Sequence, residues 1–151
     1  VESVIVEGRG GALAEVPNAS AGFGYRASRF QRTREVIVGA MIRLPERPWD
    51  EMLAAAKTEY RRRTQPLDLP NCGSIFVNPP GDYAARLIEE CGLKGRVQGG
   101  AQISPRHANF IVNLGQASAR DVLELMETAR AAVKDRFGVE LRSEIRMVGF
   151  A

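Results

Sequence analysis

The segment between Ser118 and Gly138 constrains the fold more than any other part of the chain. Ser118, followed by Asp121 three residues later, is typical of a helix N-cap, and Gly138 is typical of a helix end. The apolar residues of this segment recur at helical spacing and form one stripe: Val122, Leu125, Met126, Ala129 and Val133. Because such a stripe has to be covered by another layer, we expect this helix to belong to a small α+β layer.

Short strand-like runs accompany this helix and supply the second layer. Two further helices are expected, one from Asp50 to the residue before Pro66, and one capped by Asp82 and ended by Gly92. Runs rich in β-branched and apolar residues are typical of strands, and they occur over residues 73–78, 101–103, 109–113 and 139–150. From residue 48 the expected order is helix, strand, helix, two strands, helix and strand, so the expected fold class is α+β.

The first third of the chain forms a separate group of elements. From the N-terminus we expect a hairpin, a surface segment with a short helical turn, and a strand, over residues 1–16, 17–34 and 35–44. Pro45 and Pro48 end this last strand. We therefore expect a first domain over residues 1–46 and a second over 47–151. The first strand has no visible start, so we expect the chain to begin in the middle of a domain.

Charge, cysteine spacing and hydropathy exclude several classes of function. The 21 Lys and Arg residues against 18 Asp and Glu give a net charge of +3, too small an excess for the basic face of a nucleic-acid-binding protein. Cys72 and Cys91 lack CxxC spacing, and His107 is the single histidine, so no metal site is expected. The chain has neither a signal-peptide pattern nor a run of about 18 apolar residues. We expect a cytoplasmic protein that binds neither nucleic acid nor membrane.

For several residues that could carry chemistry, the sequence leaves two interpretations open. Ser74 follows a glycine and precedes a strand, so it is either an ordinary strand-start serine or a hydroxyl held beside a ligand. His107 could act as a base for Ser74, as in a serine hydrolase, but no GxSxG turn or neighbouring acid accompanies it. Glu144, on an apolar strand, lies either at an edge in water or in a site.

Two further segments have the same ambiguity. Gly99-Gly100 is either a simple strand boundary or a cradle of backbone N–H groups for an anion. The three arginines of residues 61–63 either cap the C-terminus of a helix in solvent or contact a pyrophosphate.

Five blocks in order along the chain resemble the UDP-N-acetylenolpyruvoylglucosamine reductase family. They are GYRASRF (24–30), NCGSIFVNP (71–79), ARLIEECGLKG (85–95), GGAQIS with HANFIVN (99–104 and 107–113) and EIRMVG (144–149). The resemblance implies the end of an FAD-binding, PCMH-like α+β lobe over residues 1–46, and a small α+β substrate-binding domain over 47–151. The resemblance also implies that the family's N-terminal FAD-binding segment is missing from these residues. The short spacing between Arg26 and Ser74 resembles the type II class.

The resemblance also implies an activity and the residues that perform it. The family is a UDP-N-acetylmuramate dehydrogenase of peptidoglycan precursor biosynthesis, in which FAD reduced by NADPH passes a hydride to C3 of an enolpyruvyl group. Ser74 stands at the position of the proton donor to C2, and a serine needs neighbours that stabilise the developing charge. Arg26 stands where the family binds the substrate carboxylate and the cofactor. Glu144, protonated or sharing a proton, would hydrogen-bond the same carboxylate.

The resemblance assigns the remaining site residues to the substrate, UDP-N-acetylglucosamine enolpyruvate. Asn78, His107 and Gly73 match substrate-binding positions, whereas Val77 replaces the family's usual lysine, a loss for which Arg63 or its neighbours would compensate. The fragment alone is expected to be inactive. The alternative is a non-catalytic nucleotide-sugar binding module in which Ser74 is a mere contact.

Overall fold

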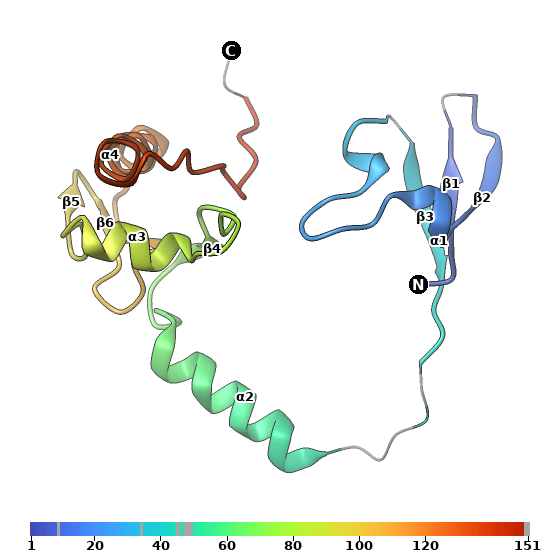
Figure 1. The fold of residues 1–151 in the computed structure, drawn as a ribbon, viewed down its shortest axis with the longest axis horizontal. Coiled ribbons are helices and arrows are strands. Elements are labelled where there is room, and N and C mark those ends of the chain that lie inside the picture. Colours follow the sequence, from blue (N-terminus) through green and yellow to red (C-terminus); the bar gives the residue numbers. More distant parts are fainter. Residues whose placement is uncertain (9, 34, 45, 47–49, 150–151) are drawn as a thin grey trace. The chain divides into compact units, whose positions relative to one another are not determined.

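The chain divides into two compact units, Val1–Trp49 and Asp50–Ala151 (Figure 1). The computed structural model describes residues 1–8, 10–33, 35–44, 46 and 50–149. Each unit has its own sheet and its own cluster of buried apolar residues, which confirms the α+β class. The predicted domain boundary falls between residues 46 and 47, and residue 47 lies outside the described residues.

Unit 1 is built on a three-stranded antiparallel sheet. Its strands are β1 (Ser3–Glu7), β2 (Leu13–Pro17) and β3 (Val36–Met41), in the order β2-β1-β3. β1 and β2 form the predicted hairpin. The connection from β2 to β3 carries α1 (Asn18–Ala21) and the 3-10 turn η1 (Arg29–Gln31), as expected for a surface segment with a helical turn. The buried cluster of this unit consists of Val4, Val6, Val16 and Ala21, with Phe30 packed against it.

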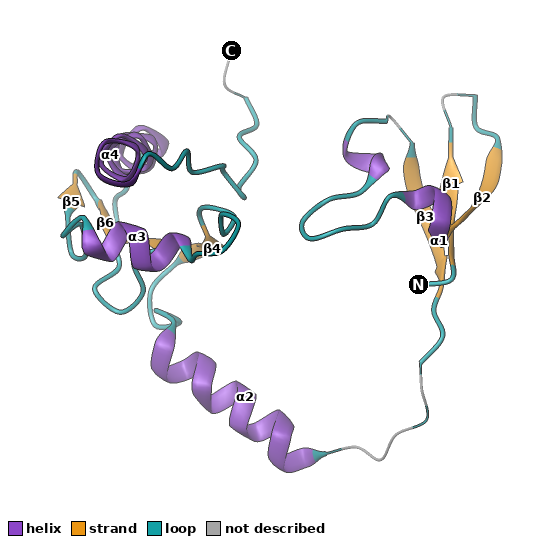
Figure 2. Cartoon of the chain, in the orientation of Figure 1, coloured by secondary structure: helices purple, strands orange, loops and turns teal. Residues whose placement is uncertain are grey.

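Unit 2 combines helices with a four-stranded antiparallel sheet, and Figure 2 shows its helices in purple and its strands in orange. In chain order its elements are α2 (Glu51–Thr64), β4 (Asn71–Ser74), α3 (Ala84–Glu90), β5 (Val97–Gln98), β6 (Ala101–Ile103), β7 (Phe110–Asn113) and α4 (Ala119–Phe137). The strand order is β4-β7-β6-β5. α4 contacts β5 and β6 and lies beside α3, whereas α2 has no buried residue.

The longest helix, α4, has the ends and the buried stripe that its sequence predicts. Ser118 and Asp121 form a capping box, because each side chain accepts from the other residue's backbone N–H, and Gly138 ends the helix in the left-handed conformation. The buried residues of α4 are Leu125, Met126, Ala129 and Val133, and they pack in one cluster with Ile103 and Ile111 of the sheet. Among the described residues, no helix is long and apolar enough to cross a membrane.

The predicted C-terminal strand is wrong for residues 139–149, and Phe150 lies outside the described residues. This segment forms one β-bridge, between Ser143 and Phe76, and no regular strand. Side chains of α4 fix it instead, because Arg130 Nε donates to the Leu141 carbonyl at 3.2 Å. The segment is therefore attached to unit 2 by a mixture of side-chain and backbone bonds rather than by a ladder.

Three local expectations also need correction. The predicted strand over 73–78 starts earlier and ends earlier, as β4, and β5 was not expected because it has only two residues. Asp82 does not cap the following helix, since α3 begins at Ala84 with Tyr83 as its N-cap residue. The Asp82 carboxylate instead accepts from the N–H of Tyr83 at 2.7 Å and binds Arg86.

Candidate functional site

Ser74 and Glu144 lie on two segments that the fold of unit 2 brings together. β4 ends at Ser74, and the chain that follows it turns to pair with residues 142–144. The Glu144 N–H donates to the Ile75 carbonyl at 2.8 Å, and the Val77 N–H donates to the Arg142 carbonyl at 2.9 Å. The predicted proton donor and the predicted carboxylate-binding acid, 70 residues apart in sequence, are therefore held by one short antiparallel contact.

The turn before Ser74 depends on Gly73. Its backbone has φ of 84°, a left-handed conformation that costs a residue with a Cβ roughly 1 kcal/mol. The Gly73 N–H donates to the side chain of Asn71 at 3.0 Å, and the Asn71 amide donates to the Pro66 and Leu69 carbonyls at 2.9 and 2.8 Å. Gly73 is thus needed for backbone geometry, and its predicted contact with substrate stays a prediction.

The side chain of Asn78 lies at the start of α3. Its Oδ1 accepts from the N–H of Ala84, the first helical residue, at 3.1 Å. Asn78 therefore has the role predicted for Asp82, because it accepts a hydrogen bond from a backbone N–H at the helix N-terminus. Its Nδ2 atom is the part of the side chain that the predicted substrate contact would use.

His107 lies in the loop between β6 and β7 and is half-buried. Burial lowers its pKa below the ordinary value of 6.5. Its Nδ1 accepts from the N–H of Asn109 at 3.3 Å, and its ring packs edge-on against Phe110 with 4.7 Å between ring centres. In a neutral imidazole with Nδ1 accepting, Nε2 carries the hydrogen, so His107 presents a donor. This suits a polar contact to a ligand better than the base of a serine hydrolase.

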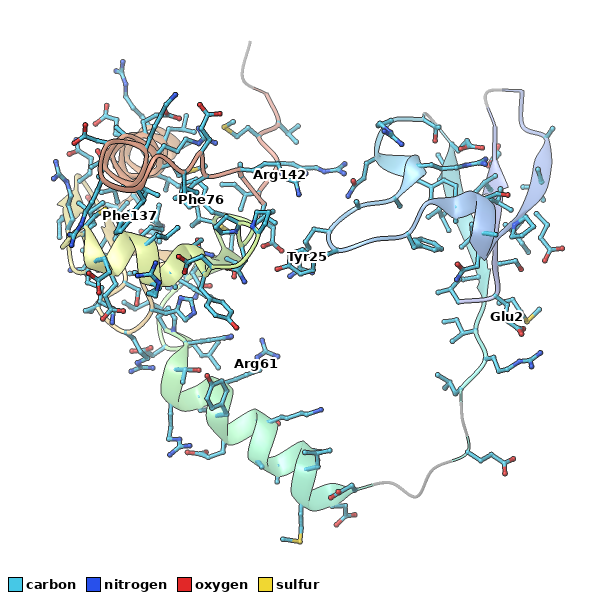
Figure 3. All side chains as sticks on the ribbon, in the orientation of Figure 1. Glu2, Tyr25, Arg61, Phe76, Phe137 and Arg142 are labelled. Carbon is cyan, nitrogen blue, oxygen red and sulfur yellow. The ribbon has the colours of Figure 1, made fainter. Side chains whose placement is uncertain are left out.

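Arg26 belongs to unit 1, where it stands at the tip of a tight turn between α1 and η1. Gly24 and Ala27 exchange backbone hydrogen bonds at 2.9 and 3.2 Å, so Tyr25 and Arg26 form the tip between them. Figure 3 labels Tyr25 on this turn. Arg26 has φ of 53°, the one left-handed non-glycine backbone among the described residues. The Arg26 guanidinium lies 5.8 Å from the centre of the Tyr25 ring. Strain of this kind, roughly 1–3 kcal/mol, tends to be retained at functional sites.

The two segments with open interpretations have ordinary structural roles. The N–H of Gly100 donates to the Asp121 carboxylate at 3.3 Å, so a protein carboxylate already occupies the amide that an anion cradle would use. The arginines of residues 61–63 lie in the last turn of α2, and Arg61 Nε donates to the Gln65 side chain at 3.3 Å (Figure 3). The structure favours a strand boundary for the first segment and a helix cap for the second.

Neither Ser74 nor Glu144 lines the hollow of about 740 Å³ between α4 and residues 140–143. Its walls carry Arg130, Lys134 and Arg142, and the first two cations are paired with Glu127 and Glu140. Within the described part of the chain, no group of three or more His, Cys, Asp or Glu residues is arranged to hold a metal.

The residue that sequence reasoning missed is Asn109, which is only 3% exposed. A single amide between Ala108 and the apolar run of β7 is the signal that could have identified it.

Comparisons with known proteins point to one family. The model of "UDP-N-acetylenolpyruvoylglucosamine reductase, C-terminal domain" matches residues 65–148. UDP-N-acetylenolpyruvoylglucosamine reductase 2 of Symbiobacterium thermophilum is 53% identical over 85% of this chain and 42% of its own length. The reductase of Chlamydia felis is 41% identical over 99% of this chain and 50% of its own length.

A solved structure agrees with these sequence relatives. The crystal structure of UDP-N-acetylenolpyruvylglucosamine reductase (MurB) from Thermus caldophilus matches with a TM-score of 0.80 and 40% identity, over 97% of this chain and 52% of that one. The chain therefore spans about half the length, or less, of the proteins it matches.

Proposed function

The chain belongs to the UDP-N-acetylenolpyruvoylglucosamine reductase family, and we propose that it is the C-terminal, substrate-binding portion of a flavoenzyme that makes UDP-N-acetylmuramate. The reaction reduces UDP-N-acetylglucosamine enolpyruvate with NADPH, through FAD, in peptidoglycan precursor synthesis in the cytoplasm. The pairing of the Ser74 and Glu144 segments carries this proposal, because backbone hydrogen bonds bring together two segments, from distant parts of the sequence, that carry a hydroxyl and a carboxyl.

We assign residues 1–46 to the end of an FAD-binding, PCMH-like lobe and residues 47–151 to the substrate-binding domain. Arg26 is exposed on a strained turn, and its planar, permanent cation fits an anionic cofactor or a carboxylate. When bound, the flavin supplies the hydride chemistry. The rest of the enzyme, including the N-terminal FAD-binding segment, is the proposed partner of the residues described here.

Ser74 would give its proton to C2 of the enolpyruvyl group. A hydroxyl is a weak acid, so the transfer needs a fixed position and neighbours that stabilise charge on the substrate carboxylate. Glu144 would hold that carboxylate through a shared proton. His107 and Asn78 would donate hydrogen bonds, from Nε2 and Nδ2 respectively, to the nucleotide-sugar.

Val77 stands where the family usually has a lysine. Its side chain is buried, 8% exposed, next to Phe76 in the interior of unit 2. A buried apolar side chain offers no charge to phosphate, and Arg63 or a neighbouring arginine, exposed in the last turn of α2, is the proposed substitute for the missing cation.

The assay that tests this function uses the full-length protein loaded with FAD. Under anaerobic conditions we expect NADPH consumption beyond the one equivalent that reduces the bound flavin only when the enolpyruvyl substrate is present, with a product two hydrogens heavier detected by mass spectrometry. The alternative, a non-catalytic nucleotide-sugar module, predicts that the same substrate binds in calorimetry while no NADPH is consumed. That result would overturn the proposed function.

A further inference from the structure

A buried amide, that of Asn109, makes two hydrogen bonds to the backbone of one residue. Asn109 precedes β7 and is 3% exposed. Its Oδ1 accepts from the Phe76 N–H at 2.9 Å, and its Nδ2 donates to the Phe76 carbonyl at 2.8 Å. The backbone carbonyl of Asn109 accepts from the Ile75 N–H at 3.0 Å.

The geometry of the neighbouring strands explains why Phe76 needs this partner. β4 and β7 are paired up to Ser74 and Phe110, and beyond Ser74 the chain pairs with residues 142–144 instead. In that second pairing the bonds come from residues 75 and 77, so the N–H and carbonyl of Phe76 point the other way, toward Asn109. The side-chain amide of Asn109 replaces a missing strand partner, and without it the buried N–H and carbonyl of Phe76 would both lose their hydrogen-bond partner.

Asn109 also orients a second residue of the predicted site. Its backbone N–H donates to His107 Nδ1 at 3.3 Å, which fixes the imidazole with its Nε2 hydrogen available. One residue therefore contacts the segment that begins at Ser74 and the loop that carries His107. The Asn109 carbonyl binds the Ile75 N–H, and the Ile75 carbonyl in turn accepts from the Glu144 N–H, so Asn109 is also linked to Glu144.

We propose that Asn109 is a positioning residue for proton transfer: by clamping the backbone of Ile75 and Phe76, it sets the place of the Ser74 hydroxyl and of Glu144. This inference rests on the proposed reductase function. A displacement of about 1 Å in a reacting group can cost roughly 100-fold in rate, so a small change in this clamp has a large effect on chemistry.

Asn109→Asp removes one half of the clamp. A carboxylate still accepts from the Phe76 N–H but cannot donate to the Phe76 carbonyl, whereas a protonated carboxyl restores the donor. In the full-length, FAD-loaded protein we expect reoxidation of the reduced flavin by substrate to slow roughly 10- to 100-fold at pH 8 and to recover as the pH falls to 5.5. Flavin reduction by NADPH should stay at the wild-type rate, which a general loss of structure would not allow.

Asn113→Asp is the matched control. Asn113 lies on β7, four residues from Asn109 in sequence, and its Oδ1 accepts from the N–H of Gly115 and of Ala117, a role that a carboxylate keeps. The charged and titratable groups on the elements around Phe76 include His107, Arg142 and Glu144, and Arg130, Glu127 and Lys134 of α4. Rates are therefore compared with wild type and with Asn113→Asp at each pH, so that titration of these groups cancels.

A second measurement does not depend on turnover. The Phe76 amide should exchange with deuterium at least tenfold faster in Asn109→Ala than in wild type, a change that corresponds to about 1.4 kcal/mol. Unchanged exchange in Asn109→Ala, or equal slowing of both flavin half-reactions in Asn109→Asp, would overturn the positioning role while wild-type turnover stands. A wild type that binds substrate without reoxidising its flavin would instead overturn the proposed function, and the catalytic part of this inference with it.

Discussion

The glycine at position 100 should be essential to the packing of unit 2, because its neighbours leave no room for a methyl group. A Cβ there would lie 2.4 Å from the backbone N of Ala117 and 2.4 Å from the backbone C of Gln116. Both contacts are with backbone atoms, so no side chain can rotate away. Since ordinary contact begins at about 3.4 Å, the β5–β6 turn and residues 116–117 would have to separate by about 1 Å.

The cost of Gly100→Ala follows from that separation. Overpacking of a well-filled site costs roughly 1–3 kcal/mol. The Leu114 N–H bond to the Gly100 carbonyl, at 2.8 Å, and the Gly100 N–H bond to Asp121 would both be strained, and each contributes about 1 kcal/mol. We expect a total loss of about 2–4 kcal/mol, which lowers Tm by about 8–32 °C for a domain of this size.

Thermal unfolding followed by circular dichroism at the helix band measures this effect, since α2, α3 and α4 all belong to unit 2. Gly10→Ala is the control, because a Cβ at Gly10 would meet nothing within 4 Å and the backbone there needs no left-handed conformation. We expect Gly10→Ala to stay within about 0.5 kcal/mol of wild type. If Gly100→Ala melts together with this control, the steric argument is wrong.

Three further predictions concern single side chains. Ser118→Ala removes the acceptor of the Asp121 N–H and should lower the free energy of unfolding by about 1 kcal/mol in urea titrations; an unchanged value would show that the cap contributes nothing. Burial lowers the pKa of His107, so the unfolded chain takes up a proton at this residue before the folded chain does as pH falls. The free energy of unfolding should therefore be highest above pH 6.5 and decline below it. His107→Gln should reduce that decline between about pH 7.5 and 5.5. The hydrogen bonds from Arg86 and from the Tyr83 N–H lower the pKa of Asp82 to about 2. NMR titration of Arg86→Gln should find the pKa of Asp82 raised toward 3.8. A pKa still near 2 in this variant would show that Arg86 does not cause the shift.

Local signals in the sequence predict most helices and strands of this protein. The capping box and Gly138 determine where α4 begins and ends without help from distant residues, and the apolar stripe determines which side is buried. The hairpin of β1 and β2 is likewise predictable from a glycine-rich turn between two short apolar runs.

Long-range contacts explain what the sequence did not predict. The alternation from Val139 onward is compatible with a strand, but Arg130 takes the Leu141 carbonyl and leaves a single bridge at Ser143. Asp82 has the chemistry of a cap, yet its pairing with Arg86 leaves that task to Asn78. Such choices depend on which partners tertiary packing makes available.

In the candidate site, too, the residue identities could be predicted from the sequence, whereas the contacts between distant segments could not. Ser74, Arg26 and Glu144 were assigned through family resemblance, and nothing in their spacing indicates that the segments of Ser74 and Glu144 pair. Asn109 was missed because its role depends on the direction of the Phe76 backbone groups, which only the folded chain defines.

The central claim is that Ser74 donates the proton that completes reduction of the enolpyruvyl group. The most direct measurement is a stopped-flow comparison of the two flavin half-reactions in full-length, FAD-loaded Ser74→Ala, with Ser20→Ala as the serine control outside the site. The account predicts that NADPH reduces the flavin of Ser74→Ala at the wild-type rate, while substrate no longer reoxidises it at a measurable rate. Reoxidation of Ser74→Ala at the rate of the Ser20→Ala control would contradict the assignment of Ser74 as the proton donor.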